Sequence, residues 1–230
     1  MDRTSGLLER TAVVIPAYNA GRLLGGVIES VAGKIARERI IVVDDGSSDD
    51  TAEVAGKTGV VVVRHLKNRG KGAALSTGLE KAYAIGSEFA ITLDADGQHD
   101  PAEIPRFLEK ERETGADIIV GNRMRDIKNM PRIRIFTNRL TSWVVSKKAG
   151  QPIPDSQNGY RLIKTALVRK LTFETCRYEW ESEILIKAGR AGARITDIPT
   201  ATIYGEERSS IHPLVDTLRF FRLVIKSFFW

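Results

Sequence analysis

Short runs of apolar, β-branched residues alternate with helical patterns through the first half of the chain. Strands are expected at 11–15, 40–43, 60–63, 89–93 and 117–120. Helices are expected at about 20–31, between Thr51 and Gly59, at about 72–85 and after Pro101. Continuous apolar strands that alternate with helices are typical of a parallel sheet covered by helices on both faces. The pattern therefore predicts an α/β fold.

The second half of the chain is less regular. Helical patterns cover about 131–149, 179–191 and 214–229, and 195–204 reads as extended. In the last helix, apolar side chains repeat at helical spacing, and the residues of this stripe are Leu214, Leu218, Phe221, Ile225 and Phe228. The basic residues Arg219, Arg222 and Lys226 fall on another face of that helix. Such a helix is typical of a bilayer interface, and packing on the enzyme core or on a partner is the alternative.

Polar residues gather where three of the expected strands end, at 16–19, 44–47 and 94–99. In a parallel sheet, ligands bind outside the carboxyl ends of the strands. The pattern therefore predicts a nucleotide-like ligand at this edge. Asp94, Asp96 and Gln98 offer oxygen ligands of the kind that Mg²⁺ or Mn²⁺ accepts beside substrate phosphates, and a capped turn is the alternative.

Composition and charge narrow the classes of protein. The chain has 230 residues, 42% of them hydrophobic, which excludes disorder and allows one sizeable core. Cys176 is the single cysteine, which excludes a disulfide framework and suits a reducing cytoplasm. The net charge is +6, and residues 123–148 alone carry +7. This basic block suits nucleic acid, anionic lipid or a phosphorylated small molecule, or is a solvated face.

Four segments carry a family resemblance, and in order they are Val14–Asn19, Val43–Thr51, Asn68–Gly72 and Leu93–His99. Together they resemble the inverting family 2 glycosyltransferases, most closely the branch of polyprenyl- or dolichyl-phosphate mannose and glucose synthases. The resemblance implies a GT-A type nucleotide-diphospho-sugar transferase fold with a mostly parallel central sheet. It implies one catalytic domain at 1–212, with a nucleotide-binding half at about 10–121 and an acceptor-side half at about 122–212. The amphipathic helix at 213–230 would follow, at the membrane interface.

Site residues follow from the same resemblance. Those implied to bind the nucleotide are Pro16, Ala17, Tyr18, Asp45, Lys71, Asp94 and Ala95. Those implied to hold Mg²⁺ or Mn²⁺ against the donor diphosphate are Asp94, Asp96 and Gln98. The chain departs from the family at Ala20, where many members carry Glu, so one nucleotide contact differs here.

Two further segments, 155–161 and 180–185, resemble the family's acceptor motifs. A hydroxyl acceptor would need a general base, for which Asp155 and Glu181 are the catalytic candidates. A phosphate acceptor is already anionic and needs positioning and charge neutralisation instead. The residues implied to bind the acceptor phosphate are Arg123, Arg134 and Asn138. For Glu181 and Glu183, a solvated helical face is the alternative reading.

The expected function is a metal-dependent inverting glycosyltransferase. It would move mannose from GDP-mannose, or glucose from UDP-glucose, to a polyprenyl or dolichyl phosphate, as a peripheral protein at the cytoplasmic face of the membrane. One alternative keeps the fold and transfers the sugar to a saccharide or another hydroxyl. A basic nucleic-acid-binding module is a third, less favoured reading, because strand-end carboxylates repel phosphate unless a metal intervenes. Nucleic acid is therefore not an expected partner.

Overall fold

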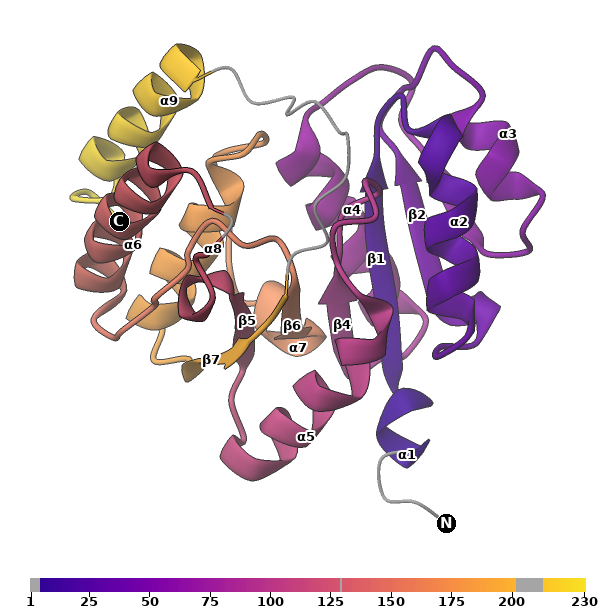
Figure 1. The fold of residues 1–230 in the computed structure, drawn as a ribbon, viewed down its shortest axis with the longest axis horizontal. Coiled ribbons are helices and arrows are strands. Elements are labelled where there is room, and N and C mark those ends of the chain that lie inside the picture. The colour runs from indigo at the N-terminus through magenta and orange to yellow at the C-terminus, as the bar shows by residue number, and fades with distance from the viewer. Residues whose placement is uncertain (1–4, 129, 202–212) are drawn as a thin grey trace.

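The computed structural model describes residues 5–128, 130–201 and 213–230. One seven-stranded sheet runs through it in the order β3-β2-β1-β4-β6-β5-β7 (Figure 1). The strands are β1 (Thr11–Ala17), β2 (Ile40–Asp44), β3 (Val61–Arg64), β4 (Phe89–Thr92), β5 (Ile118–Asn122), β6 (Arg161–Lys164) and β7 (Ile195–Pro199). All neighbouring pairs are parallel except the two that β6 makes with β4 and β5. The mostly parallel sheet that the apolar runs predict is confirmed.

The antiparallel strand β6 has no counterpart among the strands expected from the sequence. It lies between β4 and β5, with Arg161 opposite both Thr92 and Val120. Because β6 runs against its neighbours, its first residue lies at their carboxyl ends. The loop that precedes β6 therefore enters the edge of the sheet where the polar strand ends gather.

Helices cover both faces of the sheet, as expected (Figure 1). The α-helices are α1 (Ser5–Leu8), α2 (Gly21–Ala32), α3 (Thr51–Gly56), α4 (Lys71–Ala84), α5 (Ile104–Thr114), α6 (Arg132–Ala149), α7 (Thr165–Val168), α8 (Trp180–Arg190) and α9 (Pro213–Lys226), and the 3-10 helices are η1 (Arg37–Arg39), η2 (Pro101–Glu103) and η3 (Arg123–Arg125). One buried cluster joins the sheet to α4 and α8, through residues such as Leu79 and Ile184. A second joins the other face to α2 and α5, through residues such as Leu24 and Phe107.

The predicted elements match the observed ones to within a few residues at their ends. The extended stretch expected at 195–204 is a strand at its start, and its last residues, from 202, lie outside the described residues. The predicted domain boundary at 212 and the side chain of Leu214 also lie outside them. Within the described residues, no helix combines the length and apolar character needed to cross a bilayer.

Candidate active site

Three charged side chains from three different elements meet at the carboxyl edge of the sheet. Lys71, the first residue of α4, places Nζ 2.7 Å from Asp94 Oδ1 and 3.0 Å from Glu181 Oε1. Asp94 follows β4, and Glu181 lies in the first turn of α8. All three side chains are only partly exposed, so their charges are poorly screened by water.

Gly159, in the loop before β6, brings the backbone close to these charges. A Cβ at this position would meet Glu181 Oε1 at 3.0 Å, and both Asp94 Oδ2 and Lys71 Nζ at 3.3 Å. The Gly159 carbonyl is fixed because it accepts a hydrogen bond of 2.6 Å from the Thr92 hydroxyl. A side chain here would fill the space next to the charged groups. Gly159 is not among the site residues expected from the sequence, and its closeness to the three charged groups adds it to the candidate site.

The electrostatics of the cluster favour its charged form. Burial opposes the charge on Lys71, but Asp94 and Glu181 outweigh it and raise the pKa of that ammonium well above its ordinary value. Burial likewise opposes ionisation of Asp94, but Lys71 holds the pKa of its carboxyl below the usual range. Lys71 is therefore a fixed cation at neutral pH and not a base.

The start of α4 is positioned by two glycines that allow close packing. Gly70 has a φ of 101°, and a Cβ there would lie 2.5 Å from the Cys176 carbonyl oxygen. A Cβ at Gly72 would lie 2.4 Å from Trp180 Cβ. The Ala73 amide donates to the same Cys176 carbonyl at 2.9 Å. These contacts press the loop before α8 against the helix that carries Lys71.

Asp45, expected to contact the base or ribose, is almost fully buried and bonds to the protein itself. Its Oδ1 lies 2.6 Å from His65 Nδ1 and accepts from the Arg69 amide, and its Oδ2 accepts from the Gly70 amide at 2.7 Å. His65 Nε2 in turn lies 3.0 Å from the Thr77 hydroxyl. Asp45 thus anchors the loop that leads into Lys71. His65, given no role from the sequence, completes this anchor.

The other expected nucleotide residues lie at the end of β1. Tyr18 is 52% exposed, whereas Pro16 is half-buried and Ala17 buried. The loops after β1 and β2 are tied together, because Asn19 Oδ1 accepts from the Ser48 amide at 2.9 Å. At Ala20, where the family often has Glu, the backbone amide donates to Thr51 Oγ1. The exposed Tyr18 ring is therefore available to a ligand at this edge.

The acceptor-side residues form a second cluster around Asp155, which is completely buried. Asp155 accepts hydrogen bonds from the Arg123 amide, from Arg123 Nε at 2.8 Å and Nη2 at 2.9 Å, and from Asn138 Nδ2 at 2.7 Å. Burial opposes its ionisation, but the Arg123 guanidinium holds the pKa of the Asp155 carboxyl below its usual range. Asp155 therefore holds the Arg123 guanidinium in place. Of the two catalytic candidates, Glu181 is the one that contacts Lys71.

Arg134 lies one turn before Asn138 on α6 and is exposed. Arg123, by contrast, is nearly buried, and its pKa is raised because Asp155 outweighs the cost of burial. Glu181 and Asp94 also contribute to that rise, which places the guanidinium in the field of the first cluster. The two clusters are joined through Arg161, whose guanidinium donates to the Glu181 carbonyl at 2.7 Å and to the Ser156 carbonyl, next to Asp155, at 2.8 Å.

The expected metal ligands form a tight turn after β4. Asp96 Oδ1 accepts from the Gln98 amide at 2.9 Å across Gly97, which has a φ of 76°. Ala95 is buried between the two aspartates. His99 Nδ1 accepts from the Asp94 amide, and its ring stacks on Tyr160.

Within the described ranges, no group of three or more His, Cys, Asp or Glu side chains could hold a metal ion. The turn carries two carboxylates and the side-chain amide oxygen of Gln98, an all-oxygen set that would suit a hard ion completed by diphosphate and water. Burial and the neighbouring Asp94 raise the pKa of Asp96, so the two carboxylates repel each other. A divalent cation would relieve that repulsion, and the residues fit Mg²⁺ or Mn²⁺.

Glu183 is the second carboxylate in the first turn of α8, and the sequence assigns it no role of its own. It is completely buried and accepts from the Glu174 and Thr175 amides, while Lys187 Nζ lies 2.8 Å away. Glu183 therefore anchors the loop that packs on Gly70. The alternative of a solvated helical face does not apply to Glu181 or Glu183, because both are buried.

Comparison with known proteins points to one family. The dolichyl-phosphate N-acetylglucosaminyltransferase of Methanococcus voltae, which uses UDP-N-acetylglucosamine, is 32% identical over 216 residues that cover 84% of this chain and 86% of that protein. The polyprenol monophosphomannose synthase of Mycolicibacterium smegmatis is 27% identical and is covered to 76%, with 83% of this chain matched.

The solved structures include glucosyl-3-phosphoglycerate synthase from Mycobacterium tuberculosis in complex with Mn²⁺, uridine diphosphate and phosphoglyceric acid. It matches with a TM-score of 0.71 and 21% identity, over 98% of this chain and 81% of that one. At this identity the likeness shows the fold, which is of the GT-A type. The family model of glycosyl transferase family 2 matches residues 12–176. The chain is a glycosyltransferase and belongs to glycosyl transferase family 2.

Proposed function

We propose that the protein transfers a sugar from a nucleoside-diphosphate sugar to a polyprenyl phosphate, with inversion at the anomeric carbon. The observation that carries the proposal is the Arg123 guanidinium, which Asp155 holds by two side-chain hydrogen bonds inside the field of the Lys71 cluster. A guanidinium fixed in this way is suited to bind a phosphate. The relatives from Methanococcus voltae and Mycolicibacterium smegmatis, whose names state a lipid-phosphate acceptor or product, support the same acceptor class.

In this proposal the acceptor phosphate oxygen attacks the anomeric carbon, and the nucleoside diphosphate leaves from the opposite side. Arg123 and the exposed Arg134 neutralise the acceptor phosphate, and Asn138 acts through Asp155. The acceptor needs no deprotonation, because a phosphate monoester is anionic at neutral pH. Glu181 then balances the charge of Lys71 and need not act as a base.

The donor side rests on Tyr18, Lys71 and the turn at Asp94. Asp94, Asp96 and Gln98 would hold Mg²⁺ or Mn²⁺, which would neutralise the leaving diphosphate. Lys71 would supply a second fixed positive charge on that side. GDP-mannose and UDP-glucose are the donors expected from the sequence, and UDP-N-acetylglucosamine joins them because of the relative from Methanococcus voltae.

A hydroxyl acceptor is the second candidate, because Glu181 is a carboxylate within the site and the solved neighbour carries phosphoglyceric acid. Such an acceptor would require a general base, and the candidate, Glu181, is already paired with Lys71 at 3.0 Å. The phosphate acceptor is therefore preferred.

The test is a transfer assay with the purified chain. Each of the three donors is mixed with a short-chain polyprenyl phosphate or with 3-phosphoglycerate, with Mn²⁺ or with EDTA. We expect a metal-dependent polyprenyl phosphate sugar from one donor, and no product with phosphoglycerate. In Arg123→Lys the KM for the lipid phosphate should rise at least tenfold while the donor KM stays unchanged. Transfer only to the hydroxyl acceptor would overturn the proposal.

A further inference from the structure

The turn at residues 94–100, which carries the expected metal ligands, is fixed at both of its ends. At its start, the Asp94 amide donates a hydrogen bond of 3.1 Å to His99 Nδ1. At its end, the Asp100 carbonyl accepts a hydrogen bond of 2.9 Å from the Tyr160 hydroxyl. The first contact closes the turn on itself, and the second ties it to the loop before β6.

His99 and Tyr160 also stack on each other. Their ring centroids lie 4.9 Å apart, with an interplanar angle of 26°. Tyr160 is completely buried, and its ring also contacts Phe107 of α5, with the centroids 4.6 Å apart. The Gly121 amide donates to the Tyr160 carbonyl at 2.9 Å, which fixes the tyrosine backbone to the end of β5. The imidazole therefore rests on a ring that the core of the protein holds in place.

The direction of both hydrogen bonds is defined by the groups that make them. Because His99 Nδ1 accepts from an amide, the proton of the neutral imidazole lies on Nε2. Burial raises the pKa of the Tyr160 hydroxyl, so this group remains a donor at neutral pH. A side chain without the matching atom would remove the contact and leave the backbone group of the turn unpaired.

The charges of the turn explain why it needs such support. Burial and the neighbouring Asp94 carboxylate raise the pKa of Asp96, so the two carboxylates repel each other. A turn free to relax would separate them, and a cation that needs both would have to reverse that movement on binding. A backbone held at both ends keeps the carboxylates together before the ion arrives.

We propose that His99 and Tyr160 are positioning residues that hold the 94–100 turn in the shape that binds the divalent cation. The inference rests on the proposed function, in which this turn holds Mg²⁺ or Mn²⁺. It adds two residues that are not among the site residues expected from the sequence. Tyr160 belongs to the acceptor-side half of the chain, so that half supports the metal site of the donor-side half.

The test is the Mn²⁺ concentration that gives half of the melting-temperature shift produced by UDP or GDP. In His99→Ala this concentration should rise about tenfold or more, because groups that orient metal ligands typically contribute 10–100-fold to metal affinity. Tyr160→Phe keeps the ring and removes one hydrogen bond, so the rise should be roughly two- to tenfold. Without ligand, His99→Ala should melt near the wild type, because His99 is only partly buried.

Two further substitutions at His99 separate positioning from direct binding of the ion. The side-chain oxygen of Asn can take the place of Nδ1, whereas that of Gln reaches the place of Nε2. His99→Asn should therefore recover most of the Mn²⁺ affinity that His99→Ala loses, and His99→Gln should not. The reverse order would make Nε2 a ligand of the ion and would overturn the positioning role.

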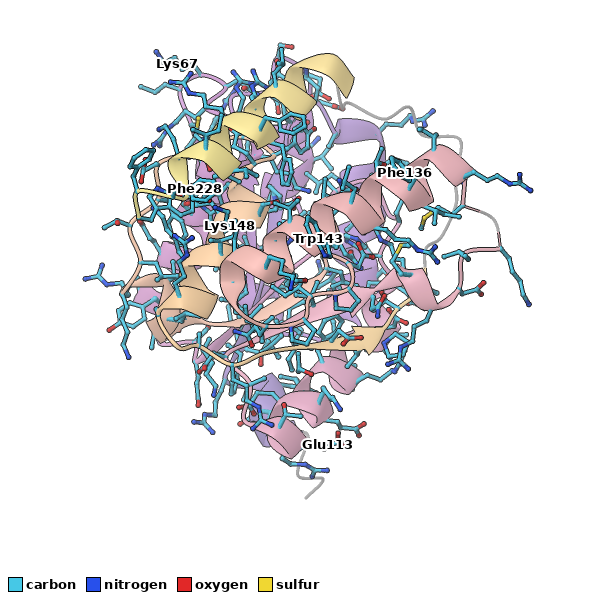
Figure 2. All side chains as sticks on the ribbon, turned by 90° about the vertical axis from the view of Figure 1, so that its left-hand side faces the viewer. Lys67, Glu113, Phe136, Trp143, Lys148 and Phe228 are labelled. Carbon is cyan, nitrogen blue, oxygen red and sulfur yellow. The ribbon has the colours of Figure 1, made fainter. Side chains whose placement is uncertain are left out.

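Two variants on other elements serve as matched controls. Phe136→Ala removes an exposed ring from α6 (Figure 2), and Tyr83→Phe removes the hydroxyl of a half-exposed tyrosine on α4. Both should require the same Mn²⁺ concentration as the wild type. An unchanged requirement in His99→Ala would overturn the inference.

Transfer to a short-chain polyprenyl phosphate separates this inference from the proposed function. At saturating Mn²⁺, His99→Ala should regain nearly the kcat of the wild type, and a kcat that stays low would overturn a role in positioning alone. If His99→Ala loses Mn²⁺ affinity but the wild type transfers to no lipid phosphate, the proposed function fails and the positioning pair stands. If the wild type transfers with Mn²⁺ and His99→Ala binds the ion unchanged, the inference fails alone.

Discussion

Lys71 is paired with two carboxylates from different parts of the chain, Asp94 after β4 and Glu181 on α8. The pair of anions keeps the ammonium charged, so the lysine serves as a permanent cation beside a leaving diphosphate. The same contact defines two alternative roles for Glu181. It either balances the charge of Lys71 or takes a proton from the acceptor as a general base.

Glu181→Gln separates these two roles. If Glu181 only balances Lys71, the variant should lose about tenfold in kcat and keep the pH profile of the wild type, because the acceptor phosphate carries its own charge. A general base contributes roughly 10²–10⁴-fold. A loss of that size, together with disappearance of the acidic limb of the pH–rate profile, would assign the base role instead. Glu183→Gln is not a suitable control, because Glu183 anchors a loop.

At the scale of elements, the position of Lys71 depends on how closely the start of α4 packs against the loop before α8 and against Trp180. Gly72 makes that packing possible, because a Cβ there would lie 2.4 Å from Trp180 Cβ and 2.7 Å from the Arg177 carbonyl oxygen. Neither atom is the end of a flexible side chain. The helix would have to shift, and Lys71 with it.

Gly72→Ala should therefore lower the stability by about 1–3 kcal/mol, the usual cost of overpacking, and reduce transfer as well. Gly56→Ala is the matched control. A Cβ at Gly56, at the end of α3, meets nothing within 4 Å, so this substitution should leave stability unchanged or slightly raise it. Urea unfolding of both variants measures the difference. Equal midpoints for the two variants would contradict the packing argument.

The apolar runs predict most elements of the fold but not β6. That strand is four residues long and begins with Arg161, a charged residue that no apolar pattern includes. Arg161 is tolerated inside because it donates to three carbonyl oxygens, those of Asn158, Ser156 and Glu181. These partners come from a loop and a helix, so local sequence cannot reveal them. The site shows the same limit: the motifs identify Lys71 and Asp94, but the anchoring by His65 and Glu183 depends on tertiary contacts.

Asp155 links three elements, because it binds Arg123 after β5 and Asn138 on α6 from the loop before β6. Its pKa is lowered in the folded protein, so it stabilises the fold above its ordinary pKa of 3.8, and this contribution is lost as the pH falls through the folded value. Asp155→Asn should cost roughly 3–5 kcal/mol at pH 7, because Arg123 stays nearly buried without its anion. The difference in the free energy of unfolding between Asp155→Asn and the wild type should shrink below about pH 4. Urea unfolding between pH 3 and 7 measures it, and a constant difference would contradict the ion-pair account.

At the scale of the whole molecule, the site joins the two halves of the chain. Lys71 and Asp94 come from the predicted nucleotide-binding half, and Glu181 and Gly159 come from the acceptor-side half. A nucleoside diphosphate that binds there with a divalent ion binds the folded state alone and therefore raises its melting temperature. When the free nucleotide concentration is a hundred times Kd, the free energy of unfolding rises by about 2.7 kcal/mol. For a chain of this size that is a shift of about 5–10 °C.

We expect this shift in melting temperature to depend on a divalent cation, because of the turn at Asp94. In the proposed function, a cation would relieve the repulsion between the two carboxylates and would let the diphosphate approach them. We therefore expect UDP or GDP to raise the melting temperature with Mn²⁺ and not with EDTA. Asp96→Asn keeps the shape of the turn but removes one charge, so it should lose most of the shift while its melting temperature without ligand stays near wild type. The nucleotide that gives the larger shift identifies the donor class. An equal shift in EDTA would mean that Lys71 alone holds the diphosphate, and the aspartates would then serve only the turn.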